Sequence, residues 1–106
     1  MIAATVRIVA VKALREFWGM HQGAEQALRF CFEQVSKAQW HQPADIKAQY
    51  ASARILKGRH VVFNIKGNDY RLVVSVAYNT GVVFVKFIGT HPAYDVIDAE
   101  TVEPEC

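Results

Sequence analysis

The chain has 106 residues, of which 52% are hydrophobic and 21% are charged. This length and composition predict a single globular domain spanning residues 1–106 and exclude a disordered chain. No apolar run is long enough to cross a bilayer, and the first residues lack the pattern of a secretory signal, so we expect no membrane association. The two cysteines, Cys31 and Cys106, have no metal-binding spacing and fit the reducing cytoplasm.

The net charge is only +2, but it is distributed unevenly along the chain. Residues 95–106 hold 5 of the 10 acidic residues and no lysine or arginine, so residues 1–94 have 12 basic and 5 acidic residues, a charge of +7. A basic body favours a polyanionic partner such as nucleic acid. Charge alone leaves open the alternative that these are ordinary solvated side chains.

The first half of the chain predicts one strand followed by helices. Apolar and polar residues alternate over Thr5–Ala10, which predicts a strand beside the main sheet. Apolar residues then recur with helical spacing in Val11–Trp18 and in Ala24–Ala38, which predicts a helical hairpin. Pro43–Tyr50 fits a short helix with proline in its first turn, and the polar, basic segment Ala51–Arg59 is predicted to be a connection.

The second half predicts an antiparallel meander of three strands, Val61–Ile65, Tyr70–Ala77 and Val82–Ile88. These runs are rich in branched and aromatic residues, and glycine- and asparagine-containing turns separate them. Together with the hairpin they predict an α+β fold in the order β-α-α-β-β-β. We expect the two helices to cover one face of the sheet.

A two-residue turn at Gly67 and Asn68 places Asn64 opposite Arg71. A second turn of even length places Ser75 opposite Lys86 and spares that lysine from burial, whereas an odd loop with a bulge moves it to the other face. The face expected to pack on the helices then carries Phe63, Leu72, Val74, Val76, Val85 and Phe87, with Val74 opposite Phe87. The other face carries Asn64, Arg71, Ser75 and Lys86.

The motifs of common metal and phosphate sites do not occur in the chain. The four histidines show no HxxxH or HExxH spacing, and Gly67-Asn68 is a hairpin turn and not a phosphate-binding loop. We therefore predict neither a metal site nor a cofactor.

The remaining candidate is a group of basic, imidazole and phenol side chains: Arg71, Lys86, Lys66, Asn64, His91 and Tyr94. Such a group suits metal-free RNA cleavage, in which the 2′-hydroxyl loses a proton, the 5′-oxygen gains one and charge builds on the phosphate. Arg71 can hold phosphate oxygens with two parallel hydrogen bonds, and His91 can exchange a proton near neutral pH. The alternative is a structural histidine and a solvated arginine.

The runs FNIKGNDYRL and FIGTHPAYD, with VKALREFW and SKAQWHQPADIKAQY upstream, resemble the HigB family of bacterial toxins, which are RelE-like mRNA interferases. The resemblance extends from about Arg7 to Asp98. It implies a RelE-like fold with a short C-terminal helix, ribosome-dependent cleavage of mRNA in the A site, and neutralisation by a cognate HigA-type antitoxin with a helix-turn-helix domain. It maps the family's arginine onto Arg71 and its C-terminal histidine and tyrosine onto His91 and Tyr94.

The predicted site also includes residues chosen for their charge or for their position on the same face of the sheet as Arg71. The predicted catalytic residues are Arg71, His91, Tyr94 and Lys86. The predicted RNA-binding residues are Asn64, Lys66, Arg59 and Lys57. Pro92 follows His91 where some relatives carry an arginine, which leaves Lys86 or Arg59 to supply charge there. The alternative function is a non-catalytic module that binds RNA or an antitoxin through the same face.

Overall fold

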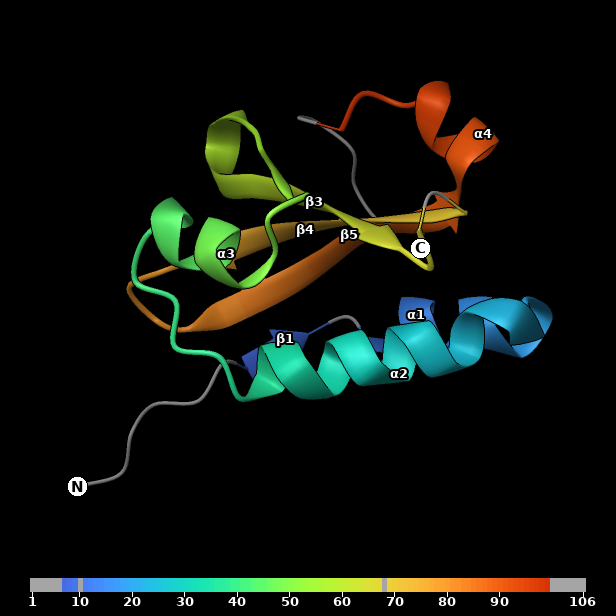
Figure 1. Ribbon diagram of the computed structural model, residues 1–106, viewed down its shortest axis with the longest axis horizontal. Helices are drawn as coiled ribbons and strands as arrows, with labels where there is room; N and C mark the ends of the chain where they lie inside the picture. The colour runs from blue at the N-terminus through green and yellow to red at the C-terminus, as the bar shows by residue number, and fades with distance from the viewer. Residues whose placement is uncertain (1–6, 10, 68, 100–106) are drawn as a thin grey trace.

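A computed structural model describes residues 7–9, 11–67 and 69–99 (Figure 1). Its elements follow the order β1 (Arg7–Val9), α1 (Val11–Met20), α2 (Gln22–Ser36), α3 (Pro43–Gln49), β2 (Arg54–Ile55), the 3-10 helix η1 (Lys57–Arg59), β3 (His60–Ile65), β4 (Tyr70–Ala77), β5 (Val82–Thr90) and α4 (His91–Asp95). The predicted α+β class, the helical hairpin and the three-stranded meander are confirmed.

Within the described residues, the sheet has the strand order β1-β5-β4-β3-β2. The meander β3-β4-β5 is antiparallel, and β1 adds to its edge as a parallel neighbour of β5. Of the strand expected at residues 5–10, residues 7–9 are observed and the others lie outside the described residues. The prediction that residues 51–59 form only a connection was wrong, because Arg54 and Ile55 pair with Val62 and Val61 of β3.

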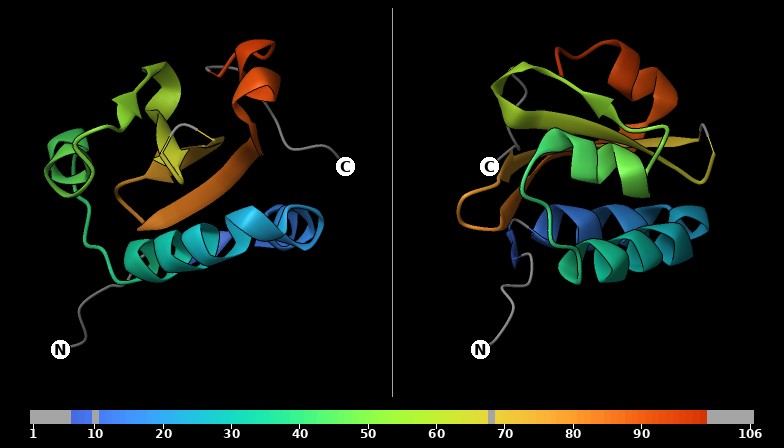
Figure 2. Two further views of the ribbon diagram at one scale, coloured as in Figure 1. Left: turned by 45° about the vertical axis from the view of Figure 1, so that its right-hand side comes forward. Right: turned by 60° about the vertical axis from the view of Figure 1, so that its left-hand side comes forward.

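The elements form three layers, as Figures 1 and 2 show. Helices α1 and α2 lie side by side beneath one face of the sheet, while α4 and η1 lie on its opposite side. Helix α3 packs near β3, where Trp40 and Tyr50 contact the ring of Phe63. None of the described helices has the length and hydrophobicity needed to cross a membrane.

The core lies between the helical hairpin and the sheet. Helix α2 buries one side chain in each turn, namely Ala24, Leu28, Cys31 and Val35, and these pack with Phe63, Leu72, Val74, Val76 and Val85 from the sheet. Full burial of one leucine or valine contributes about 1.5–3 kcal/mol. Burial also raises the pKa of the Cys31 thiol to about 11, so this cysteine stays protonated at neutral pH and acts as a core residue.

The hydroxyl group of Tyr78 is poorly accommodated in this fold. The Oη atom of Tyr78 is buried and has no hydrogen-bond partner among the described residues. Burial, and to a smaller extent the negative charge of Asp45, raises the pKa of this side chain. A buried hydroxyl without a partner lowers stability because it has lost its hydration.

We therefore expect Tyr78→Phe to increase the free energy of unfolding by about 1 kcal/mol in urea denaturation. Tyr94→Phe is the matched control, since the Tyr94 hydroxyl lies at the exposed surface, and it is expected to change stability by less than about 0.5 kcal/mol. A clear loss of stability in Tyr78→Phe would show that the hydroxyl does have a partner.

Candidate active site

Arg71 lies in β4 on the face of the sheet opposite to α1 and α2. It pairs with Asn64 of β3, as predicted, and with Gly89 of β5. Its neighbour Leu72 belongs to the core beneath, and successive side chains of a strand alternate between faces. Arg71 is only 9% exposed, and its Nη1 donates a hydrogen bond to the carbonyl oxygen of Tyr70 at 3.3 Å. This packing restricts the guanidinium to one place on the face.

A β-bulge in β5 changes the register that the sequence predicts further along the strand. The second turn has an even length, because Ala77 pairs with Val82, but the register shifts between Val73 and Val74. Val73 pairs with Phe87, Val74 pairs with Val85, and Ser75 pairs with Phe84. The predicted pairs of Ser75 with Lys86 and of Val74 with Phe87 were therefore wrong. Lys86 is the extra residue of the bulge.

The bulge also moves Phe87 to the other face of the sheet. The prediction that Phe87 packs under the helices was wrong, and Ile88, which pairs with Leu72, packs against the core in its place. The Phe87 ring instead lies over Gly89, where an added Cβ would come within 2.6 Å of its Cζ. Since one inserted residue reverses the alternation, the strand presents an aromatic ring beside Arg71.

Lys86 remains on the face that carries Arg71. Its Nζ lies 5.8 Å from the centre of the Phe84 ring, and Phe84 is 44% exposed. Lys86 therefore lies on the predicted face because it is the extra residue of a bulge, and not because it pairs with Ser75 as predicted.

Helix α4 begins where β5 ends and brings His91 and Tyr94 to the same end of the sheet. Thr90 caps the helix, because its Oγ1 accepts a hydrogen bond from the Ala93 amide at 3.3 Å. The backbone amide of His91 donates to the carbonyl oxygen of Asp69 at 3.1 Å, which ties α4 to the turn before Arg71. The Nε2 of His91 lies 3.4 Å from Oδ1 of Asp95, and its side chain is 44% exposed.

Tyr94 lies between two arginines. The Cζ of Arg71 is 5.9 Å from the centre of its ring, and Nη1 of Arg54 donates to its hydroxyl at 3.5 Å. Arg54 was not among the predicted site residues, because β2 was not predicted. The strand pairing explains its position: Arg54 lies opposite Val62, and paired residues point to the same face.

A hollow of about 390 Å³ adjoins this group of side chains. It is lined by Arg54, Leu56, Tyr94, Ile97, Asp98 and Ala99. The segment after α4 closes one side of the hollow, because the carbonyl oxygen of Ala99 lies 2.8 Å from Nδ1 of His60. The segment that follows α4 thus covers part of the face of the sheet that carries Arg71.

The other predicted RNA-binding residues are more widely spread. Lys57 and Arg59 belong to η1, which leads into His60, and His60 pairs with Ser75 at roughly 13 Å along the strand from Arg71. Lys66 turns toward the helices, since a Cβ added at Gly23 would lie 3.3 Å from its Nζ. The structure therefore brings Lys66 to the start of α2 and not to the group around Arg71.

The gathered side chains define the chemistry available at this end of the sheet. Two guanidinium groups can bind and stabilise an anion, an exposed imidazole can donate or accept a proton, and a phenol between the arginines can orient a bound group. Within the described residues, no three His, Cys, Asp or Glu side chains are grouped so as to hold a metal ion.

Comparison with known proteins identifies relatives of this chain. Residues 24–97 match the HigB toxin family, described as the RelE-like toxic component of a toxin–antitoxin system. The chain is also similar to the mRNA interferase toxin HigB of Escherichia coli (strain K12) and to mRNA interferase HigB of Shigella flexneri. Each is 25% identical over 96 residues, which cover 89% of this chain and 92% of the relative. The matched region spans more than half of the chain and includes Arg71, His91 and Tyr94, so the chain belongs to the HigB family of RelE-like toxins.

Proposed function

We propose that this toxin is an endoribonuclease that cleaves mRNA in the A site of the translating ribosome and thereby arrests protein synthesis in the cytoplasm. The support is threefold: the family is the toxic component of a toxin–antitoxin system, the relatives are named mRNA interferases, and Arg71, Arg54 and Tyr94 form a cationic site at helix α4, which also carries His91. The arrangement of Tyr94 between the two guanidinium groups carries the proposal.

The proposed reaction uses only groups of the chain and the RNA. The 2′-oxygen attacks the adjacent phosphorus while its proton passes to a base, and the bond from phosphorus to the 5′-oxygen breaks as that oxygen receives a proton. The products are a 2′,3′-cyclic phosphate, which water can open to a 3′-phosphate, and a free 5′-hydroxyl. No metal ion is required for either proton transfer.

Arg71 would hold the non-bridging phosphate oxygens, where negative charge grows in the transition state. Donors placed in this way are worth about 2.7–4 kcal/mol each. His91 would act as the acid or the base, and Tyr94 would orient the scissile group. Arg54, at the Tyr94 hydroxyl, would add positive charge there, and Lys86, whose Nζ lies over the Phe84 ring opposite Ser75, would contact the RNA farther along the same face.

The test is to add the purified chain to a reconstituted translation reaction and to map the mRNA ends. We expect cleavage of ribosome-bound mRNA, fragments with cyclic or 3′-phosphate and 5′-hydroxyl ends, and no cleavage of the same mRNA without ribosomes. The control is His91→Ala, which is expected to leave the mRNA intact. Intact mRNA with the unaltered chain would favour the non-catalytic binding module.

The proposed partner in the cell is a HigA-type helix-turn-helix antitoxin, since the family is one half of a toxin–antitoxin pair. Co-expression with the neighbouring reading frame should restore translation and yield a stable complex on purification. Recovery of translation without a complex would contradict this part of the proposal.

A further inference from the structure

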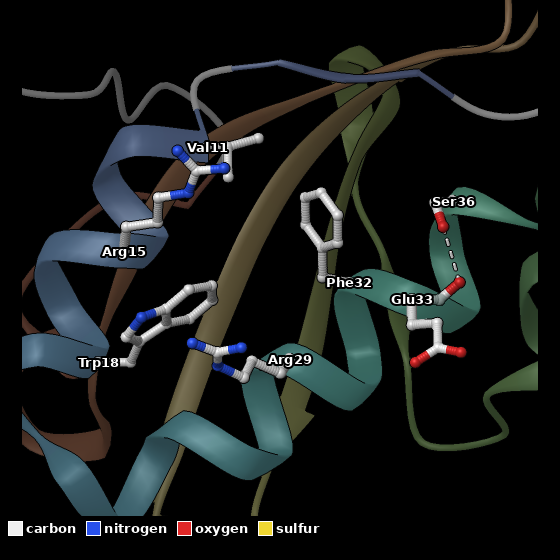
Figure 3. Close-up of a pocket in the computed structure, with 7 residues that line it drawn as sticks. All are labelled: Val11, Arg15, Trp18, Arg29, Phe32, Glu33 and Ser36. Carbon is white, nitrogen blue, oxygen red and sulfur yellow. Dashed lines mark hydrogen bonds between the residues drawn. The ribbon is translucent and has the colours of Figure 1, made fainter.

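A second concave site lies between α1 and α2, on the layer of the molecule that covers the opposite face of the sheet. It is a hollow of about 450 Å³ lined by Val11, Arg15, Trp18, Arg29, Phe32, Glu33 and Ser36. Figure 3 shows Arg15 and Trp18 of α1 on one side of it and Phe32 of α2 on the other, with the guanidinium of Arg29 next to the indole of Trp18. None of these residues contributes to the group around Arg71.

The hollow is cationic. The Cζ of Arg29 lies 5.2 Å from the centre of the Trp18 ring, and only its Nε is engaged, at 2.8 Å from Oε2 of Glu25. Arg15 has no hydrogen-bond or ion-pair partner among the residues that the structure describes. The single carboxylate of the lining, that of Glu33, is 3.2 Å from Nζ of Lys37, which offsets its charge.

We propose that this hollow binds one nucleotide of a single-stranded RNA. The phosphate would be held by Arg15 and by the free nitrogens of Arg29, and the base would stack on the flat surface made by the Arg29 guanidinium and Trp18. Proteins bind unpaired nucleotides in this way, with bases on aromatic rings or guanidinium planes and phosphates at arginines. The volume lies in the range of sites for small ligands.

The choice of RNA over an acidic peptide rests on the proposed function, because the mRNA interferase relatives point to an RNA partner. The extent of the site supports the same choice. A specific interface with another protein buries roughly 1,200–2,000 Å², whereas the cationic and aromatic groups here are confined to the lining of one hollow, which suits a single nucleotide. The site lies across the sheet from Arg71, so it would strengthen RNA binding without taking part in cleavage.

The two tryptophans of the chain allow this binding to be followed directly. Trp18 lines the hollow, whereas Trp40 is 4% exposed and stacks on Phe63. The probe is a ten-nucleotide oligouridylate added to the full chain carrying Arg71→Ala, so that the RNA remains intact. We expect quenching of the tryptophan emission that disappears in Trp18→Phe, where only Trp40 is left.

Affinity is measured in parallel from the fluorescence anisotropy of the labelled oligouridylate. Arg15→Gln in the same background is expected to weaken binding about tenfold and to reduce the salt dependence by about 0.7 in log–log slope, one phosphate contact. The matched control is Lys12→Gln, which removes the same charge from α1 at a residue whose side chain is 87% exposed and lies outside the hollow. It is expected to change affinity less than twofold.

Three results would overturn the proposal. They are the absence of Trp18 quenching by the oligouridylate, equal losses of affinity in Arg15→Gln and Lys12→Gln, and quenching of Trp18 by an acidic peptide but not by the oligouridylate. Because binding is measured in a chain that carries Arg71→Ala, this outcome is independent of cleavage. Quenching at Trp18 by RNA in a chain whose unaltered form leaves mRNA intact would contradict the proposed nuclease and retain the nucleotide site.

Discussion

Arg71→Ala is expected to slow mRNA cleavage by about 10²–10³-fold, the effect of removing one well-placed donor to an oxyanion. Arg71 is 9% exposed and its Nη1 is bonded to the carbonyl of Tyr70, so its guanidinium is oriented before any substrate binds. Arg54 reaches the site from β2 and donates to the Tyr94 hydroxyl, so it does not take the position of the Arg71 guanidinium. The measurement is the rate of appearance of cleaved mRNA in a reconstituted translation reaction at saturating toxin.

Two controls separate the chemistry from folding and from general charge. Arg71→Lys keeps the charge but loses the planar fork that can bind two phosphate oxygens, and we expect it to remain at least about tenfold slower than the unaltered chain. Lys37→Ala removes a positive charge from the exposed C-cap residue that follows α2 and should leave the rate unchanged. Full activity in Arg71→Ala with an unchanged melting temperature would contradict the assignment.

The elements that the sequence predicted correctly are those with long, regular patterns. The apolar positions of α2 recur over fifteen residues, and their helical spacing predicted the helix that buries Leu28 and Cys31. The β3–β4 hairpin is short and its turn contains Gly67, so the pairing of Asn64 with Arg71 followed from local geometry. Both features depend on interactions between residues close in the sequence.

The features that the sequence did not predict depend on contacts between distant segments. The bulge at Lys86 shifts the pairing of β5 with β4 between Val73 and Val74, and the Phe87 ring then lies over Gly89. Strand β2 has two residues, too few for any alternation to be visible, and it exists because Val61 and Val62 offer a free edge. Arg54 was missed for the same reason.

Leu28→Ala is expected to cost about 2–5 kcal/mol of unfolding free energy, a large part of the roughly 5–15 kcal/mol typical of a domain. Leu28 is fully buried where α2 meets the sheet, so the truncation leaves a cavity beneath Leu72 and Val74. The matched control is Phe30→Ala on the same helix, because Phe30 is 64% exposed and its removal should change stability by less than about 0.5 kcal/mol. Both values are obtained from urea denaturation monitored by circular dichroism.

Leu28→Ala and Arg71→Ala should both relieve translational arrest in cells, but for different reasons. Leu28→Ala is expected to relieve translational arrest because less folded toxin is present, so more protein or a lower temperature should restore the arrest. Arg71→Ala should not recover under either condition, since the folded chain lacks the group that holds the phosphate. If Leu28→Ala and Phe30→Ala had similar stabilities, the helical hairpin would not be the support of the sheet, and the position of Arg71 on the far face would need another explanation.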